Sequence, residues 1–120
     1  MSQILLVDDD PVVLFLHHAL LKRINTSSSV LSFDDGELAL AHIQAEQQDN
    51  MLILLDINMP VCDGWTFLTD LRKIPHFKGS IVLVTSSIDV ADQNRAKSFP
   101  EVAGYLEKPL TAEKLKPFLP

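Results

Sequence analysis

Short apolar runs alternate along the chain with longer segments whose apolar residues recur at helical spacing, and this alternation constrains the fold more than any other feature. A run of about four or five apolar residues is long enough for a strand but too short for a helix. Strands that alternate with helices indicate an α/β protein with a parallel sheet. The predicted strands cover residues 4–7, 30–33, 51–55, 81–84 and 102–106, and the third is apolar throughout, as expected of a strand covered on both faces.

The segment after the first run predicts an amphipathic helix over residues 11–22. Asp10 is a residue type preferred at an N-cap, and Pro11 fits the first turn, where the missing N–H has no partner to lose. Apolar residues at helical spacing predict the face of this helix that packs against the sheet. That predicted face consists of Val12, Phe15, Leu16, Ala19 and Leu20.

Four more helices are predicted from capping residues, which satisfy the first N–H groups, and from prolines, which cannot continue a helix. The last helix is expected to be short or bent, because a proline follows its cap by about a turn and a half. The second helix is capped by Asp34 or Asp35, and Pro60 and Gly64 mark a loop before the third. Asp89 starts the fourth helix and Pro100 stops it, and Thr111 caps the last helix, which Pro117 shortens.

Together these elements predict one α/β domain over residues 1–120, with five parallel strands and five helices. A chain of 120 residues is about one domain of common size, and it can bury a core without disulfides. Right-handed crossovers would place helices on both faces of a doubly wound sheet. In such sheets the functional site lies beyond the carboxyl ends of the strands, so the reactive side chains should follow the strands.

Carboxylates follow the first and third predicted strands, hydroxyl groups follow the fourth, and an ammonium group follows the fifth. Carboxylates that cluster at one edge repel one another, so they need a cation, and hard oxygen ligands suit magnesium. A carboxylate can also act as the nucleophile that forms an aspartyl phosphate, and an ammonium group can neutralise the transferring oxygens. The strand-end residues are Asp8, Asp9 and Asp10 after the first strand, Asp56 after the third, Thr85, Ser86 and Ser87 after the fourth, and Lys108 and Pro109 after the fifth.

These residues lie in sequence motifs that resemble the receiver-domain family of response regulators. The motifs agree in order and approximate spacing, and the resemblance covers essentially the whole chain. It implies the flavodoxin-like strand order 2-1-3-4-5 and a phosphorylation switch rather than an enzyme. The segments that carry it are Leu5-Leu6-Val7-Asp8-Asp9-Asp10, Leu54-Leu55-Asp56-Ile57-Asn58-Met59-Pro60, Asp63-Gly64, Val84-Thr85-Ser86 and Tyr105-Leu106-Glu107-Lys108-Pro109.

The resemblance also implies a role for each site residue. Asp56 would accept the phosphoryl group. Asp9, Asp56 and the backbone carbonyl of Asn58 would bind Mg2+, and Asp8 would hold a metal-bound water. The other implied roles are a switch hydroxyl for Thr85, an aromatic switch for Tyr105, a phosphoryl-oxygen partner for Lys108, and a cis peptide bond before Pro109.

The implied partners are a histidine kinase or histidine phosphotransfer protein as donor and an unidentified downstream protein. A homodimer through the fourth helix, fifth strand and fifth helix is possible in this family, although Pro117 puts that face in doubt. Two alternatives remain open. A pseudo-receiver would bind proteins without phosphorylation, but Asp9, Asp56 and Lys108 are all present. A haloacid-dehalogenase-type phosphatase would have a second aspartate where Asn58 stands, and the chain has no room for its cap domain.

Composition excludes other classes of function and bears on location. The net charge is −6 and no basic stripe is visible, which argues against nucleic-acid binding. No apolar stretch approaches the ~20 residues that span a bilayer, and no basic segment precedes the first strand as in a secretory signal. A single cysteine permits no internal disulfide, which fits a reducing compartment. We therefore expect a cytoplasmic protein.

Overall fold

Strands and α-helices alternate strictly along the chain, and a short 3₁₀ helix follows the last α-helix. The computed structural model describes all residues except 1–2, 25–26, 47–49, 60–62, 87 and 120. Each predicted strand is present, with boundaries within two residues of the prediction. The elements are β1 (Gln3–Val7), α1 (Pro11–Ile24), β2 (Ser29–Phe33), α2 (Gly36–Ala45), β3 (Met51–Asp56), α3 (Gly64–Leu71), β4 (Gly79–Thr85), α4 (Val90–Ala96), β5 (Val102–Glu107), α5 (Ala112–Leu115) and η1 (Lys116–Phe118).

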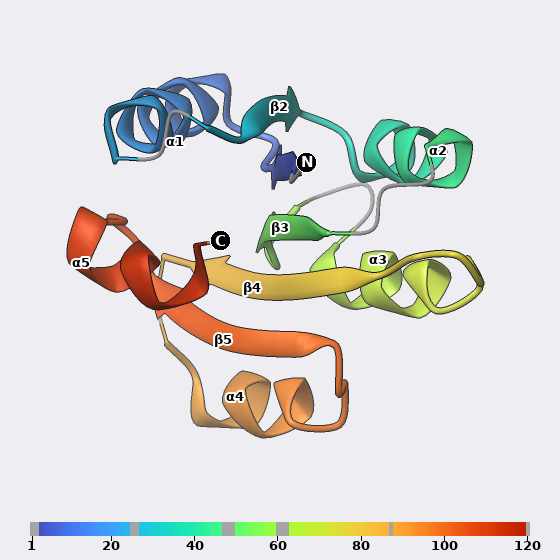
Figure 1. Cartoon of the computed structure of the whole chain (residues 1–120). Coiled ribbons are helices and arrows are strands. Elements are labelled where there is room, and N and C mark those ends of the chain that lie inside the picture. Colours follow the sequence, from blue (N-terminus) through green and yellow to red (C-terminus); the bar gives the residue numbers. More distant parts are fainter. Residues whose placement is uncertain (1–2, 25–26, 47–49, 60–62, 87, 120) are drawn as a thin grey trace.

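The five strands form one parallel sheet in the order β2-β1-β3-β4-β5, which confirms the predicted order (Figure 1). Parallel neighbours need crossover connections, and here each connection carries a helix. The fold is therefore doubly wound and flavodoxin-like, as predicted. β3 lies at the centre of the sheet, and β2 and β5 form its edges.

Two hydrophobic clusters fill the spaces on the two faces of the sheet. Successive side chains of a strand point to opposite faces, so Leu5 and Val7 of β1 pack in the cluster with α2, α3 and α4. Ile4 and Leu6 of the same strand pack in the cluster with α1 and α5. All of β3 is buried, which confirms that this strand is covered on both faces.

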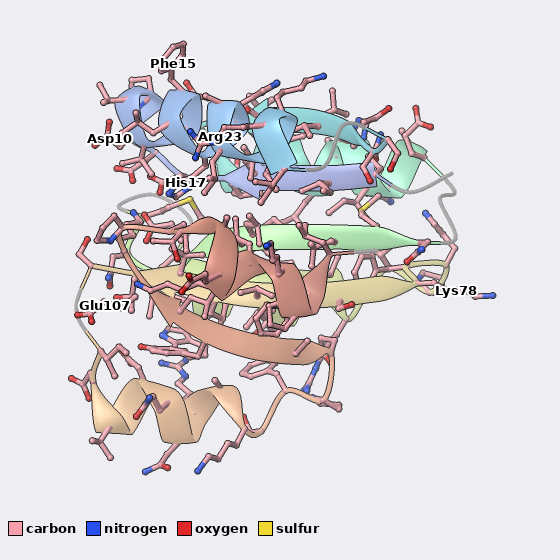
Figure 2. The ribbon with its side chains drawn as sticks, turned by 60° about the vertical axis from the view of Figure 1, so that its left-hand side comes forward. Asp10, Phe15, His17, Arg23, Lys78 and Glu107 are labelled. Atoms are coloured by element: carbon pink, nitrogen blue, oxygen red, sulfur yellow. The ribbon has the colours of Figure 1, made fainter. Side chains whose placement is uncertain are left out.

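The structure contradicts the predicted buried face of α1. Val12, Phe15 and Leu16 are 64%, 72% and 58% exposed, and Ala19 is also exposed. Figure 2 shows Phe15 projecting away from the sheet, whereas His17 points inward. The residues of α1 that are buried are Leu14, His17, Leu20 and Leu21, so only Leu20 was placed correctly.

The cause is a helix that is apolar almost all round in its first two turns. Residues 11–16 are apolar without interruption, so helical spacing does not fix which side meets the sheet. The sheet instead receives a face centred on Leu14 and His17. The apolar side chains of Val12, Phe15 and Leu16, close to the acidic end of β1, therefore remain exposed to solvent.

The helix starts agree with the predicted caps, whereas α4 ends at Ala96, four residues before the proline that was expected to stop it. Oδ1 of Asp10 accepts the N–H of Val12 at 2.9 Å, and Asp35, rather than Asp34, caps α2. Asp89 and Thr111 cap α4 and α5. The last α-helix ends at Leu115 and continues as η1, so the predicted shortening at Pro117 is confirmed.

Gly64 was placed in a loop, but it is the first residue of α3, after Asp63 as N-cap. A Cβ on Gly64 would lie 2.7 Å from Cα of Ile57, so glycine lets the helix start directly against the segment after β3. Pro60, the other residue predicted to mark this loop, lies outside the described residues. None of the described helices is long and apolar enough to cross a membrane.

Candidate functional site

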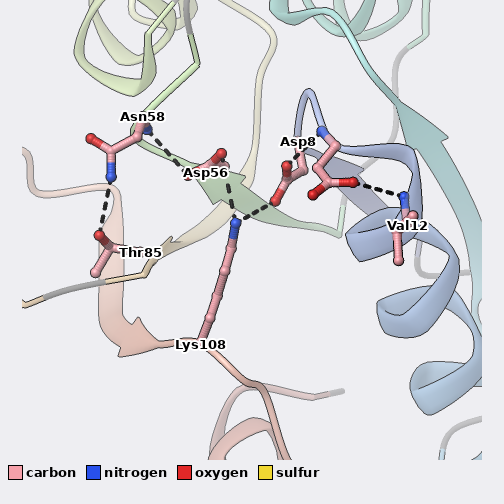
Figure 3. A network of polar contacts seen from close by, with 7 residues as sticks. Asp8, Val12, Asp56, Asn58, Thr85 and Lys108 are labelled. Carbon is pink, nitrogen blue, oxygen red and sulfur yellow. Dashed lines mark hydrogen bonds and ion pairs between the residues drawn. The ribbon is translucent and has the colours of Figure 1, made fainter.

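The predicted site residues meet at the carboxyl edge of the sheet, because the parallel strands all end on that side (Figure 3). Asp8 directly follows β1, Asp56 ends β3 and Thr85 ends β4. Lys108 directly follows β5. Asp8, Asp56 and Thr85 are buried, with 4%, 5% and 1% of their surfaces exposed, so three polar groups are held at the boundary between core and solvent.

Lys108 joins two of the carboxylates. Its Nζ lies 2.8 Å from Oδ2 of Asp8 and 3.7 Å from Oδ2 of Asp56, and it is itself largely enclosed. The N–H of Lys108 donates to the carbonyl of Thr85 at 2.7 Å, which extends the β4–β5 pairing past the end of β5 and fixes the backbone of the lysine. The peptide bond between Lys108 and Pro109 is cis, as the resemblance implied.

Backbone N–H groups orient the buried carboxylates. Oδ1 of Asp8 accepts the N–H of Asp10 at 2.9 Å, and Oδ1 of Asp56 accepts the N–H of Asn58 at 3.1 Å. Burial raises the pKa of Asp56, the N–H of Asn58 lowers it, and Asp8 raises it further. Lys108 acts in the opposite direction, and the Asp9 carboxylate again raises the pKa.

Asp8, Asp9 and Asp56 each offer a carboxylate oxygen to one region, and the three oxygens lie within 4.8 Å of one another. Opposite oxygens around an octahedral magnesium ion are about 4 Å apart, so an ion bound by two of these carboxylates would leave the third within reach of a metal-bound water. Asp9 is exposed at the mouth of the site, where an ion can enter. The donor set is made of hard oxygen atoms, and it fits magnesium. Coordination by the carbonyl of Asn58 stays a prediction.

A hydrogen bond from Asn58 to Thr85 connects the end of β3 with the end of β4. Nδ2 of Asn58 donates to Oγ1 of Thr85 at 3.2 Å, across 27 residues of sequence. This side-chain contact was not predicted, because the metal-binding role implied for Asn58 used its backbone carbonyl. No sequence signal predicts it, since it depends on how both side chains are oriented at the edge.

Tyr105 lies on β5, and its ring packs against the cluster under α3 and α4. Its hydroxyl oxygen is enclosed and, among the described residues, lacks a hydrogen bond of good geometry. Burial raises the pKa of this hydroxyl, as do the nearby carboxylates of Asp92 and Asp89. The phenol is therefore a neutral, weakly held group beside the β4–α4 connection.

His17 is a second residue whose position the sequence did not reveal. This residue is 8% exposed and points inward from α1 (Figure 2), and it lines the same groove as Pro109 and Leu110. Burial lowers its pKa, and the nearby charges of Asp8 and Lys108 act in opposite directions. The imidazole of His17 is therefore a neutral group near Asp8 and Lys108.

The family model described as "Response regulator receiver domain" matches residues 4–119. The chain is 34% identical over 116 residues to the two-component response regulator ARR22 of Arabidopsis thaliana, which covers 97% of this chain and 80% of that protein. It is 32% identical over 114 residues to the probable C4-dicarboxylate response regulator DctR of Halalkalibacterium halodurans, covering 95% of this chain but 48% of that protein.

Solved structures agree. A response regulator receiver protein from Dyadobacter fermentans superimposes with a TM-score of 0.86 at 26% identity, covering 100% of this chain and 99% of that one. The receiver domain of sensor histidine kinase PA1611 from Pseudomonas aeruginosa, solved with a magnesium ion in its active-site cleft, has a TM-score of 0.79 at 26% identity. It covers 96% of this chain and 91% of that one.

The chain belongs to the response regulator receiver domain family of two-component systems. It spans about half the length of DctR, so whatever the rest of that protein does has no counterpart in these residues.

Proposed function

We propose that this domain is a phosphorylation switch in which Asp56 accepts a phosphoryl group in a magnesium-dependent reaction. The observation that carries the proposal is Lys108, whose Nζ lies between the carboxylates of Asp8 and Asp56 while a third carboxylate, Asp9, faces the same point. Three acids and one ammonium group leave a net negative charge, and this favours a divalent cation and then a phosphoryl group.

Asp56 is suited to act as the nucleophile. One of its oxygens is held by the N–H of Asn58, so the other can attack the phosphorus of a phosphohistidine. The new bond forms between a carboxylate oxygen and phosphorus, the bond from phosphorus to the histidine nitrogen breaks, and the imidazole leaves and takes up a proton. Lys108 then neutralises a phosphoryl oxygen, for which it needs to move little from its place 3.7 Å from Asp56.

Asp9, Asp56 and the carbonyl of Asn58 would hold the magnesium ion, with Asp8 on a bound water. When bound, the ion would draw charge from the transferring oxygens. In this arrangement Asp8 would keep its hydrogen bond from the N–H of Asp10 and its ion pair with Lys108. Its carboxylate could therefore accept a hydrogen bond from the metal-bound water without moving.

The hydroxyl of Thr85 is the candidate switch group. It accepts a hydrogen bond from the amide of Asn58, and a phosphoryl group on Asp56 would offer three new acceptor oxygens nearby. If Thr85 turns to donate to one of them, the start of the β4–α4 connection moves with it. Tyr105, whose enclosed hydroxyl faces that connection, would respond to the change and alter the surface formed by α4 and β5, where a downstream protein binds.

The donor protein would dock on the exposed apolar face of α1. Val12, Phe15 and Leu16 lie there, and α1 begins next to the acidic strand end, so a protein that covers this face also reaches Asp56. A groove of about 350 Å³ continues the apolar surface toward the cis proline. Its lining residues are Leu16, His17, Ala19, Leu20, Arg23, Pro109 and Leu110. A histidine kinase or histidine phosphotransfer protein would place its apolar helices there.

The test is intact mass after incubation with magnesium and acetyl phosphate. We expect a gain of one phosphoryl group in the wild-type protein, and none in Asp56→Asn or in wild-type protein treated with EDTA. Phe15→Ser is the matched variant for docking. It should accept phosphate from acetyl phosphate normally but lose transfer from its protein donor. Equal labelling of Asp56→Asn would refute the assignment of the phosphoacceptor.

A further inference from the structure

The anchoring of α4 is unusually weak for a helix beside a proposed switch. Ala96 is the only buried residue among Val90–Ala96, and Val90 is 70% exposed. A helix of seven residues is unstable by itself, and its stability comes from the surface that it packs against. With one buried side chain, α4 must depend on other contacts to keep its place beside β5 (Figure 1).

A stack of four side chains supplies such a contact. The guanidinium of Arg95, on α4, lies 4.6 Å from the ring centroid of Trp65, on α3. The rings of Trp65 and Phe99 stack with centroids 6.0 Å apart and 30° between their planes. The guanidinium of Arg72, at the end of α3, lies 4.4 Å from the ring centroid of Phe99. Two cations thus cover the outer faces of two aromatic rings, which attract positive charge.

The two ends of the stack differ in how firmly they are held. Nε of Arg72 donates to Glu101 at 3.0 Å, and Nη2 donates to the carbonyl of Ser98 at 3.0 Å, so Phe99 and the segment after α4 are tied to α3. Arg95 is exposed, and within the described part of the chain its guanidinium forms neither an ion pair nor a hydrogen bond. The Arg95 end can separate while the Arg72 end remains in place.

The stack also connects the two sides of the proposed switch. Trp65 follows Gly64, which packs directly against Ile57, the residue next to Asp56, and donates its N–H to the carbonyl of Ile57 at 3.2 Å. On the other side, α4 begins five residues after Thr85. In this structure the stack is present together with the hydrogen bond from Asn58 to the hydroxyl of Thr85, and we assign both to the unphosphorylated domain.

We propose that the contact between Arg95 and Trp65 is a latch, which holds α4 against α3 in the unphosphorylated domain and opens when Thr85 turns toward a phosphoryl group on Asp56. The latch rests on the proposed function for its trigger, but the holding contact does not. A cation–π contact at a partly exposed site changes an equilibrium about two- to fivefold. That is enough to bias a switch whose two states are close in energy.

Trp65 is the only tryptophan, so its emission reports on the latch without a label. Arg95→Gln removes the cation but keeps a polar side chain of similar length. Lys97→Gln is the matched control, because it removes the same charge from the same end of α4 at an exposed residue outside the stack. The measurements are Trp65 emission with and without beryllofluoride and magnesium, the apparent affinity for beryllofluoride, and amide hydrogen exchange of α4 without ligand.

In the wild-type protein and in Lys97→Gln, beryllofluoride should change the Trp65 emission. In Arg95→Gln the emission should already be shifted and should change little on binding. This variant should also bind beryllofluoride about two- to fivefold more tightly and exchange the amides of α4 faster by a similar factor. Normal affinity, normal exchange and a full emission change in Arg95→Gln would overturn the latch while leaving phosphorylation intact.

If the wild-type protein neither gains a phosphoryl group by mass nor binds beryllofluoride, the proposed function fails and the latch loses its trigger. The exchange measurement then still decides whether Arg95 holds α4. If the amides of α4 exchange at the same rate in Arg95→Gln as in the wild type, the claim that Arg95 holds α4 is refuted as well.

Discussion

Asp56→Asn should stabilise the metal-free protein, because the wild-type carboxylate is buried among like charges. At an effective dielectric constant of about 20, the ion pair with Lys108 at 3.7 Å contributes about 4.5 kcal/mol. Repulsion from the buried carboxylate of Asp8, within 4.8 Å, and from the exposed Asp9 opposes it by roughly the same amount, and Asp8 contributes more than Asp9 to the raised pKa of Asp56. These charge interactions nearly cancel, so the cost of burial decides the sign.

That cost is several kcal/mol for a carboxylate, and the hydrogen bond from the N–H of Asn58 returns about 1.5–3 kcal/mol. An asparagine oxygen can accept the same hydrogen bond without a charge. We therefore expect Asp56→Asn to raise the free energy of unfolding by about 1–2 kcal/mol in EDTA near pH 7.5. For a domain of this size the melting temperature would rise by roughly 3–8 °C.

The stability gained by Asp56→Asn should increase as the pH rises. The pKa of Asp56 is raised in the folded state, so the folded protein holds this proton more tightly than the unfolded chain. Below the unfolded carboxyl pKa of about 4, wild type and Asp56→Asn should have about the same free energy of unfolding. As the pH rises through the raised pKa of Asp56, the wild type should become less stable than the variant. Melting followed by circular dichroism from pH 4.5 to 8 in EDTA measures this, with the exposed cap variant Asp10→Asn as control. A lower melting temperature for Asp56→Asn at pH 7.5, or a gain independent of pH, would refute the electrostatic argument.

Three further perturbations test other parts of the site. Magnesium should raise the melting temperature of the wild type, since it binds only the assembled site, and Asp9→Asn should abolish that rise without lowering the stability of the metal-free protein. Lys108→Ala should lower the free energy of unfolding, measured in urea, by about 2–4 kcal/mol, because Asp8 and Asp56 lose their buried partner. The variant should still gain a phosphoryl group by mass, but it should fail to signal. Gly64→Ala should lower stability by about 1–3 kcal/mol and slow labelling by acetyl phosphate, because its Cβ would push Ile57 beside the phosphoacceptor; unchanged labelling would separate α3 from the chemistry.

The strands and the location of the site could be predicted because both follow from one-dimensional rules. An apolar run of strand length has few alternatives, and the residue after each parallel strand must lie at the same edge of the sheet. Asp8, Asp56, Thr85 and Lys108 therefore came together as expected. The short last helix was predictable for an equally local reason, since Pro117 lacks an N–H.

The buried side of α1 could not be predicted, because its first two turns offer apolar side chains in every direction. Only the packed structure shows that Leu14 and His17 face the sheet and that Phe15 does not. Contacts between side chains distant in sequence were also out of reach. The hydrogen bond from Asn58 to Thr85 depends on the orientation of both side chains, which no spacing rule fixes.

The ion pair between Asp8 and Lys108 joins residues 100 positions apart. Asp8 directly follows β1 and Lys108 directly follows β5, and two further strands separate β1 from β5 in the sheet. Any partly folded chain that lacks the edge strand β5 also lacks the ammonium group that the acids need. Closing so long a loop is entropically costly, so this contact needs the intervening sheet to bring its two ends together. The acidic pocket is thus completed only when the whole sheet is in place, so a nascent or locally unfolded chain would hold the acids without the ammonium group through which we propose that the domain signals.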